Sequence, residues 1–128
     1  MKLNSYIIPF LFFLLNFLLR WLGIEINSLA GDEPFSVYFA QMDITDIIRH
    51  LKSGNNPPLY EIFLHYWISW FGIGEIAVRI PSLIFTALTA SYIFKLGNDF
   101  FSKLAGITSA LAYTLSNYAT IFSHEARV

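Results

Sequence analysis

The sequence contains no cysteine and little charge. None of its 128 residues is a cysteine, which excludes a disulfide framework, a thiolate metal site and a cysteine nucleophile. Asp, Glu, Lys and Arg together make up 13% of the chain, whereas a soluble domain usually carries about 25%. The net charge of −1 gives no sign of a nucleic-acid partner. The sequence also has no glycine-rich phosphate loop and no Ser-His-Asp order.

Hydrophobic residues are abundant instead. They make up 55% of the chain, and the mean hydropathy of +0.54 is typical of an integral membrane protein. Three apolar runs, at residues 6–24, 80–97 and 104–122, approach the length of about 20 residues that a spanning helix needs. A polar link at residues 98–103 joins the last two runs into a predicted hairpin. Small residues, which let helices approach closely in lipid, recur in both: Ser82, Thr86, Ala87, Ala90, Ser91, Ala105, Gly106, Ser109, Ala110 and Ala112.

The first run carries one charge, at Arg20. Because Arg20 lies near the end of the run, we expect its long side chain to reach the lipid headgroups. A cleavable signal peptide is the alternative, since Met1 and Lys2 form a basic start and residues 28–30 resemble a cleavage site. Arg20 and Glu25 would make the polar tail of such a peptide too long, so we favour a retained span.

The segment at residues 25–79 is predicted to form short helices at the membrane surface. An acid followed by Pro34 is typical of a helix start, and we expect a helix at residues 35–41. Asp43 has the character of a second N-cap, and Gly54 that of the stop that ends this helix. The segment is therefore more structured than a plain linker.

A further helix is predicted at residues 58–71, with one polar side. Glu61, His65 and Ser69 follow the i, i+4, i+8 spacing of one helix face. The pattern is that of an amphipathic helix lying in the membrane surface with this polar face in water. A short spanning helix is the alternative, and it would invert the topology of everything downstream. The apolar stripe of the other face comprises Leu59, Ile62, Phe63, Tyr66, Trp67 and Trp70.

Five motifs follow one another along the chain. They are Asp32-Glu33; Asn56-Pro57-Pro58-Leu59-Tyr60; Phe71-Gly72 with Glu75, Arg79, Pro81 and Ser82; Leu96-Gly97 with Ala105-Gly106; and Glu125-Ala126-Arg127. In this order the chain resembles the N-terminal part of polyprenyl-phosphate-sugar-dependent glycosyltransferases with the membrane-embedded GT-C fold. This superfamily includes the protein O-mannosyltransferases, the lipid A aminoarabinose transferases and bacterial family-39-like enzymes.

The resemblance implies an all-α integral membrane protein, the N-terminal piece of a GT-C fold. In one membrane domain (1–128) it would have three transmembrane helices and interfacial juxtamembrane helices. It places residues 25–79 and the start of a second outer loop at residues 123–128 on the extracytoplasmic side, and residues 98–103 in the cytoplasm. Lys and Arg counts alone do not settle this orientation. Because such enzymes are several times longer, we expect this chain to be truncated.

The resemblance also implies a function at the cell membrane. A multi-pass enzyme of this kind transfers a sugar from a polyprenyl-phosphate carrier to an acceptor hydroxyl, so the expected partners are the lipid-linked sugar donor and membrane lipid. The acceptor stays open, and no nucleic acid is expected. The alternative is a non-catalytic small membrane protein, either a truncated product or an accessory subunit, because three helices hardly enclose a cavity for a lipid-linked sugar.

The resemblance assigns catalysis to two acids. Asp32 is the expected base that takes the acceptor proton, and Glu33 is an expected acceptor or metal contact. Helix capping beside Pro34 is the alternative for both. No cofactor is certain, although a divalent metal stays open. The spacing of Glu61 and His65 suits a metal, but two residues make no metal site.

Substrate binding is assigned to Asn56, Arg79, Glu125 and Arg127. Asn56 stands where many relatives have His or Lys before the two prolines, which puts that role in doubt. For Arg79, the alternative to a phosphate contact is an interfacial anchor paired with Glu75, four residues earlier. For Glu125 and Arg127, the alternative is a solvated helix end.

Overall fold

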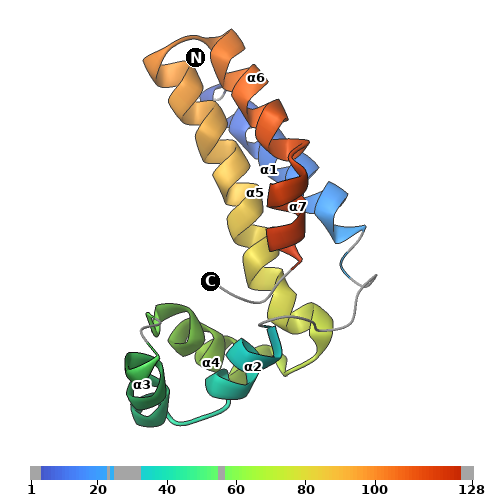
Figure 1. The fold of residues 1–128 in the computed structure, drawn as a ribbon. Helices are drawn as coiled ribbons and strands as arrows, with labels where there is room; N and C mark the ends of the chain where they lie inside the picture. Colours follow the sequence, from blue (N-terminus) through green and yellow to red (C-terminus); the bar gives the residue numbers. More distant parts are fainter. Residues whose placement is uncertain (1–3, 23, 25–32, 55–56, 125–128) are drawn as a thin grey trace. The chain divides into compact units, whose positions relative to one another are not determined.

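The computed structural model describes residues 4–22, 24, 33–54 and 57–124 (Figure 1). Within these ranges the chain forms seven helices and no strand, which confirms the predicted all-α class. The chain divides into two compact units. Unit 1 consists of Met1–Ile24 and Pro81–His124, and unit 2 of Glu25–Ile80 and Glu125–Val128.

Unit 1 is a bundle of helices that pack through aromatic and small side chains. Phe12, Phe94 and Ala110 form its buried core cluster, and the rings of Phe12 and Phe94 stack at 5.4 Å between centroids. The helices run alongside one another in Figure 1. They are α1 (Asn4–Trp21), α5 (Glu75–Phe100) from Pro81 onward, α6 (Lys103–Thr114) and α7 (Asn117–Ser123).

Two glycines allow the predicted hairpin between α5 and α6 to close. A Cβ atom added at Gly97 would lie 2.6 Å from the Cα of Gly106, and one added at Gly106 would lie 2.6 Å from the carbonyl oxygen of Phe94. Both distances are too short for any other residue. The turn is tighter than predicted, because α5 continues to Phe100 and α6 begins at Lys103. The Ser102 hydroxyl accepts a hydrogen bond from the Ala105 N–H and caps α6.

Only one helix among the described residues has the length and composition of a membrane span. This helix, α5, has 26 residues, or about 39 Å at 1.5 Å per residue. The apolar helix Tyr6–Trp21 is shorter. The third predicted span is not one continuous helix, because Thr114 ends α6 and Asn117 begins α7. The three predicted spans are therefore not confirmed as three spanning helices.

The break between α6 and α7 explains the position of Arg20. The Arg20 guanidinium donates to the carbonyl oxygens of Thr114 (3.3 Å) and Ala119 (3.5 Å) and to the side chain of Asn16. Thr114 ends α6, where carbonyls lack helical donors and buried protein groups must satisfy them, whereas Ala119 lies inside α7. Arg20 is only 2% exposed. The prediction that it reaches out to the headgroups is wrong, because its donors are used inside the bundle.

Unit 2 contains three short helices and the first turns of α5. The helices α2 (Glu33–Ala40), α3 (Ile44–Ser53) and α4 (Leu59–Phe71) lie near the predicted ranges, with α2 starting two residues earlier than expected. Asp43 and Gly54 are the caps of α3, as predicted, although the Asp43 side chain makes no capping hydrogen bond. Gly72 ends α4 with a φ of 84°, a conformation that favours glycine. The core cluster of unit 2 is Val37, Ala40, Leu64 and Val78.

Pro81 lies inside α5 and leaves a gap in its hydrogen bonding. Proline has no N–H, so the carbonyl oxygen of Ala77, four residues earlier, loses its helical donor. The indole N–H of Trp67 on α4 donates to this oxygen at 2.8 Å. The contact ties α4 to the start of α5.

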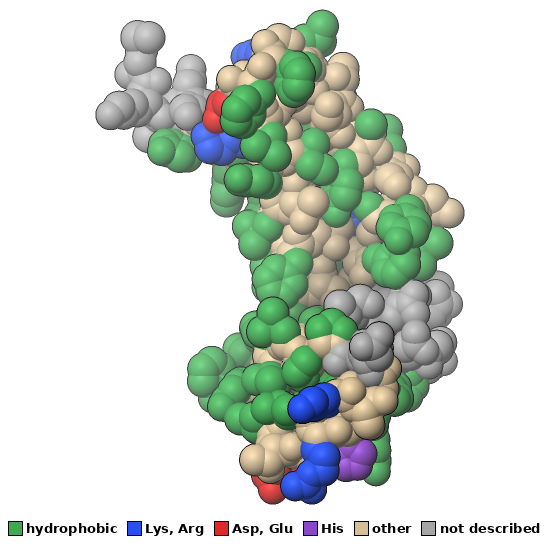
Figure 2. Space-filling view, turned by 60° about the vertical axis from the view of Figure 1, so that its left-hand side comes forward, with side chains coloured by type: hydrophobic (Ala, Val, Ile, Leu, Met, Phe, Trp, Pro, Cys, Tyr) green, Lys and Arg blue, Asp and Glu red, His purple; other side chains and the backbone are tan. Residues whose placement is uncertain are grey.

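The prediction that the polar face of α4 lies in water is wrong for Glu61. Glu61 is buried, and the His65 ring nitrogen Nδ1 lies 2.8 Å from the carbonyl oxygen of Ala40 on α2. Glu61 and His65 of the polar face therefore pack against α2, whereas Ser69 is exposed. Leu59 and Trp70 on the apolar stripe are 78% and 79% exposed. The exposed side chains of Arg49, His50 and Lys52 lie on α3, and Figure 2 shows basic, acidic and His side chains gathered at the lower end of the view.

Candidate active site

The polar centre of unit 2 is an ion pair between Glu33 and Arg79. Arg79 donates from Nε to Glu33 Oε1 at 2.9 Å and from one terminal nitrogen to Oε2 at 2.8 Å. Both side chains are 2% exposed. This two-point geometry matches the planar guanidinium to the planar carboxylate. It is strong and directional because water is excluded around it.

Local sequence positions both partners of this pair. Glu33 is the first residue of α2, directly before Pro34, which favours the first turn of a helix. Arg79 lies in the first turns of α5 and is buried, as is its neighbour Val78. The alternative pairing of Arg79 with Glu75 is not what the structure has, since Glu75 is exposed. The pair spans 46 residues of sequence, so helix spacing alone could not reveal it.

A second buried acid, Glu61, lies between α4 and α2. The Ser36 hydroxyl donates to Glu61 Oε1 at 3.5 Å, and Ser36 is one turn of α2 beyond Glu33. Glu61 is 4% exposed, and its Oε2 atom has no hydrogen-bond partner in the described part of the chain. Burying such an oxygen without a donor costs about 1–3 kcal/mol. The sequence pattern placed Glu61 in water and did not predict its burial. The spacing of Glu61 and His65 on one helix face was the signal that could have indicated a polar contact with another helix.

The structure brings together two of the six predicted site residues, Glu33 and Arg79. The other four lie outside the described residues: Asp32, Asn56, Glu125 and Arg127. Among the residues that are described, no group of three or more His, Asp or Glu side chains could hold a metal ion. Of the two buried acids of unit 2, Glu33 forms an ion pair with Arg79 and Glu61 accepts a hydrogen bond from Ser36.

This arrangement holds the carboxylate of Glu33, the first residue of α2, beside the guanidinium of Arg79. The buried groups of unit 2 that carry charge are Glu33, Glu61 and Arg79 in the described ranges, two acids against one guanidinium. The rigid pair holds the N-terminal end of α2, which directly follows Asp32.

A comparison with protein families identifies the chain more closely. The family described as dolichyl-phosphate-mannose-protein mannosyltransferase matches residues 55–127, more than half of the sequence. The chain belongs to this family, as the motif order predicted. Its members are GT-C-type glycosyltransferases and multi-pass membrane proteins that use a polyprenyl-phosphate-linked sugar donor. No match was found among curated proteins or among solved structures.

Proposed function

We propose that this chain is the N-terminal portion of a membrane glycosyltransferase that transfers a sugar from a polyprenyl-phosphate carrier to an acceptor hydroxyl. The family match supports the reaction class, which is glycosyl transfer. The buried Glu33–Arg79 pair is the observation that supports the location of the site. It involves the first residue of α2, which follows Asp32, the expected base, in the sequence.

The proposed reaction has two requirements. The Asp32 carboxylate accepts the proton of the acceptor hydroxyl as its oxygen attacks the anomeric carbon. The bond between the anomeric carbon and the phosphate oxygen breaks, and its electron pair leaves with the polyprenyl phosphate. Cations near the headgroup stabilise this departing charge. We assign that role to Arg127, with Asn56 and Glu125 as further contacts to donor or acceptor.

For Glu33 and Arg79 the geometry favours a positioning role. Both oxygens of the Glu33 carboxylate accept hydrogen bonds from Arg79, so this carboxylate is already engaged within the protein. The Arg79 guanidinium in turn is directed at Glu33. We therefore propose that the pair fixes Glu33, the residue that follows Asp32 in the sequence, and contributes to the local electrostatic field, whereas Asp32 itself exchanges the proton.

The deciding experiment is Asp32→Asn in the full-length protein. Asn caps a helix about as well as Asp but cannot act as a base, so we expect transfer of radiolabelled sugar from polyprenyl phosphate to fall about 10²- to 10⁴-fold with normal expression. Asp43→Asn is the matched control, since Asp43 caps α3 without a side-chain hydrogen bond. Near-normal transfer by Asp32→Asn would mean that Asp32 is only a cap.

A non-catalytic membrane protein is the second candidate function. The observation that favours it is that α5 alone, among the described helices, meets the length and composition of a span. The DNA sequence directly downstream of the Val128 codon distinguishes the enzyme from the non-catalytic protein. An in-frame continuation with further hydrophobic runs supports the enzyme, whereas a stop directly after Val128 supports an accessory or inactive product.

A further inference from the structure

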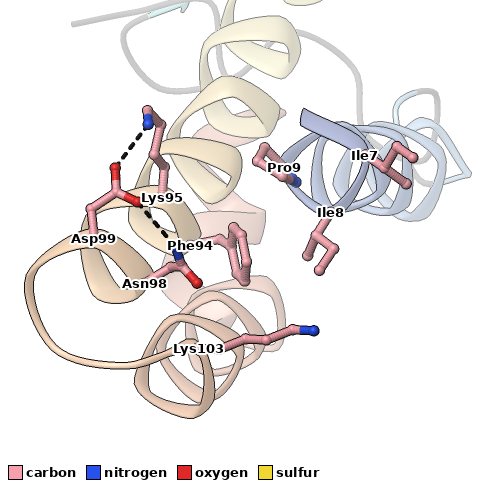
Figure 3. A pocket seen from close by; sticks show the side chains of 8 residues that line it. All are labelled: Ile7, Ile8, Pro9, Phe94, Lys95, Asn98, Asp99 and Lys103. Carbon is pink, nitrogen blue, oxygen red and sulfur yellow. Dashed lines mark hydrogen bonds and ion pairs between the residues drawn. The ribbon is translucent and has the colours of Figure 1, made fainter. Parts of the chain in front are cut away.

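An open cavity of about 340 Å³ lies at the end of unit 1 where the hairpin turns (Figure 3). Its walls come from the start of α1, the end of α5 and the start of α6. Apolar side chains of α1, among them Ile8 and Pro9, form one side together with Phe94. The opposite side carries Lys95, Asn98, Asp99 and Lys103. The cavity is therefore amphiphilic.

The polar side of this cavity has an excess of positive charge. Two lysines face one aspartate, which gives a net charge of +1. Lys95 pairs with Asp99 at 2.8 Å, and the Asn98 amide donates to the same carboxylate at 3.0 Å. Lys103 makes no ion pair with any described residue, and Figure 3 shows its side chain extending toward the Ile8 side of the opening. An anion that enters the cavity thus meets the Lys103 ammonium, while Asp99 opposes it.

A second, mostly apolar hollow of about 480 Å³ continues from this cavity along α5. The two share Pro9 and Lys95 in their linings. From Lys95 the groove follows Tyr92 and Leu88 to Phe85. Ten residues of helix separate Lys95 from Phe85, or about 15 Å. This length equals about half of a hydrocarbon core of about 30 Å, which is the depth of one lipid leaflet.

We infer that the cavity and the groove together bind one molecule of an anionic glycerophospholipid. Its phosphate accepts hydrogen bonds from Lys103 and Asn98 at the hairpin end, and one acyl chain lies in the groove between α1 and α5. The inference is independent of the proposed sugar transfer. It rests on the joined polar and apolar linings, their net charge and the length of the groove.

Charge and shape favour this occupant over the other sources of phosphate. A free phosphate would leave the apolar groove exposed, although apolar burial supplies about 0.8 kcal/mol per CH₂ group. A zwitterionic lipid would bring its own cation to a site that already has a positive excess. An anionic phospholipid satisfies both parts of the site.

The test is native mass spectrometry of the purified full-length protein with defined lipids. We expect higher occupancy with palmitoyl-oleoyl-phosphatidylglycerol than with the matching phosphatidylcholine. Lys103→Gln should weaken phosphatidylglycerol binding about five-fold, which corresponds to about 1 kcal/mol for one cation at an anionic lipid surface. Lys52→Gln, at an exposed lysine of α3, is the control with the same change of charge and should have no effect.

Two further variants separate binding from misfolding. Asp99→Asn removes the opposing carboxylate and should raise phosphatidylglycerol occupancy, a gain that a misfolded protein would not show. Thr89→Trp should block the groove. Thr108→Trp is its control, because Thr108 is also exposed and its hydroxyl also bonds the carbonyl oxygen four residues earlier.

Four outcomes would overturn the inference. One is equal occupancy by the two lipids, and another is equal loss in Lys103→Gln and Lys52→Gln. Displacement of the lipid by millimolar inorganic phosphate would identify an anion site without a lipid. Stronger, Lys103-dependent binding of undecaprenyl phosphate would identify a site for the donor lipid instead.

Discussion

The Glu33–Arg79 pair is the buried ion pair among the described residues of unit 2, and its energetic role is measurable. Because both side chains are buried, removing either one takes from the other a buried partner of opposite charge. We expect Glu33→Met and Arg79→Met each to lower the free energy of unfolding by about 3–5 kcal/mol. The double variant should lose less than the sum, since an apolar pair leaves no charge behind. Denaturation in mixed detergent micelles measures all three.

The control for this double-mutant cycle of Glu33 and Arg79 is an exposed ion pair in the same unit. Arg49 and Asp46 on α3 lie 3.0 Å apart, but their side chains are 76% and 42% exposed. Breaking that pair with Asp46→Ala should change stability by no more than about 1 kcal/mol. Additive losses in the Glu33 and Arg79 cycle would show that the two residues do not stabilise each other.

Glu61 tests which face of α4 is buried. Glu61→Lys would bury a longer cation where an unpartnered oxygen already lies, so we expect loss of the folded protein from the membrane fraction. Ser69→Lys, on the exposed end of the same helix, should be tolerated. Glu61→Met removes the unpartnered oxygen and should leave stability unchanged or raised. A stable Glu61→Lys protein would restore the view that this face lies in water.

At the scale of elements, the α5–α6 hairpin depends on contact between two glycine backbones. An added methyl at Gly106 would meet the Phe94 carbonyl oxygen at 2.6 Å, and backbone cannot yield as a flexible side chain does. We expect Gly106→Ala to lower the thermal midpoint measured by fluorescence-detected size exclusion by several degrees. Gly74→Ala is the control, because a Cβ there meets no atom within 4 Å. Equal midpoints for the two variants would argue against close packing of the hairpin.

Element ends were predictable where a local signal decides them. The caps Asp43 and Gly54 of α3 and the stop at Gly72 follow from backbone preferences of single residues. The break after Thr114 was not predictable in this way. Its run of apolar residues is continuous in sequence, and the break is stabilised by Arg20 from a distant helix. The inward turn of Glu61 likewise depends on α2, which no periodicity within α4 could reveal.

At the scale of the whole molecule, the topology stays a prediction with a direct test. The family resemblance places residues 25–79 outside and residues 98–103 in the cytoplasm. Cysteines introduced as Asn55→Cys and Ser102→Cys can be distinguished cleanly, because the natural chain has no cysteine. In intact cells an impermeant thiol reagent should label the first and not the second. The opposite labelling pattern would invert the topology.

The site was predictable from sequence in part only. Motif order led to the family, and the match over residues 55–127 confirms it. The pairing of Glu33 with Arg79 was missed because contacts across 46 residues depend on how the helices pack. Glu75 seemed the simpler partner for Arg79 because it lies one helical turn away.

The position of Arg20 has a consequence for the order of biosynthesis. Its guanidinium bonds carbonyl oxygens that come 94 and 99 residues later in the chain. At a translation rate of about 5–20 residues per second, these acceptors emerge roughly 5–20 s after Arg20. During that interval the Arg20 guanidinium lacks these two acceptors. The hydrogen bonding of unit 1 around this arginine is therefore completed only after α6 and α7 have been synthesised.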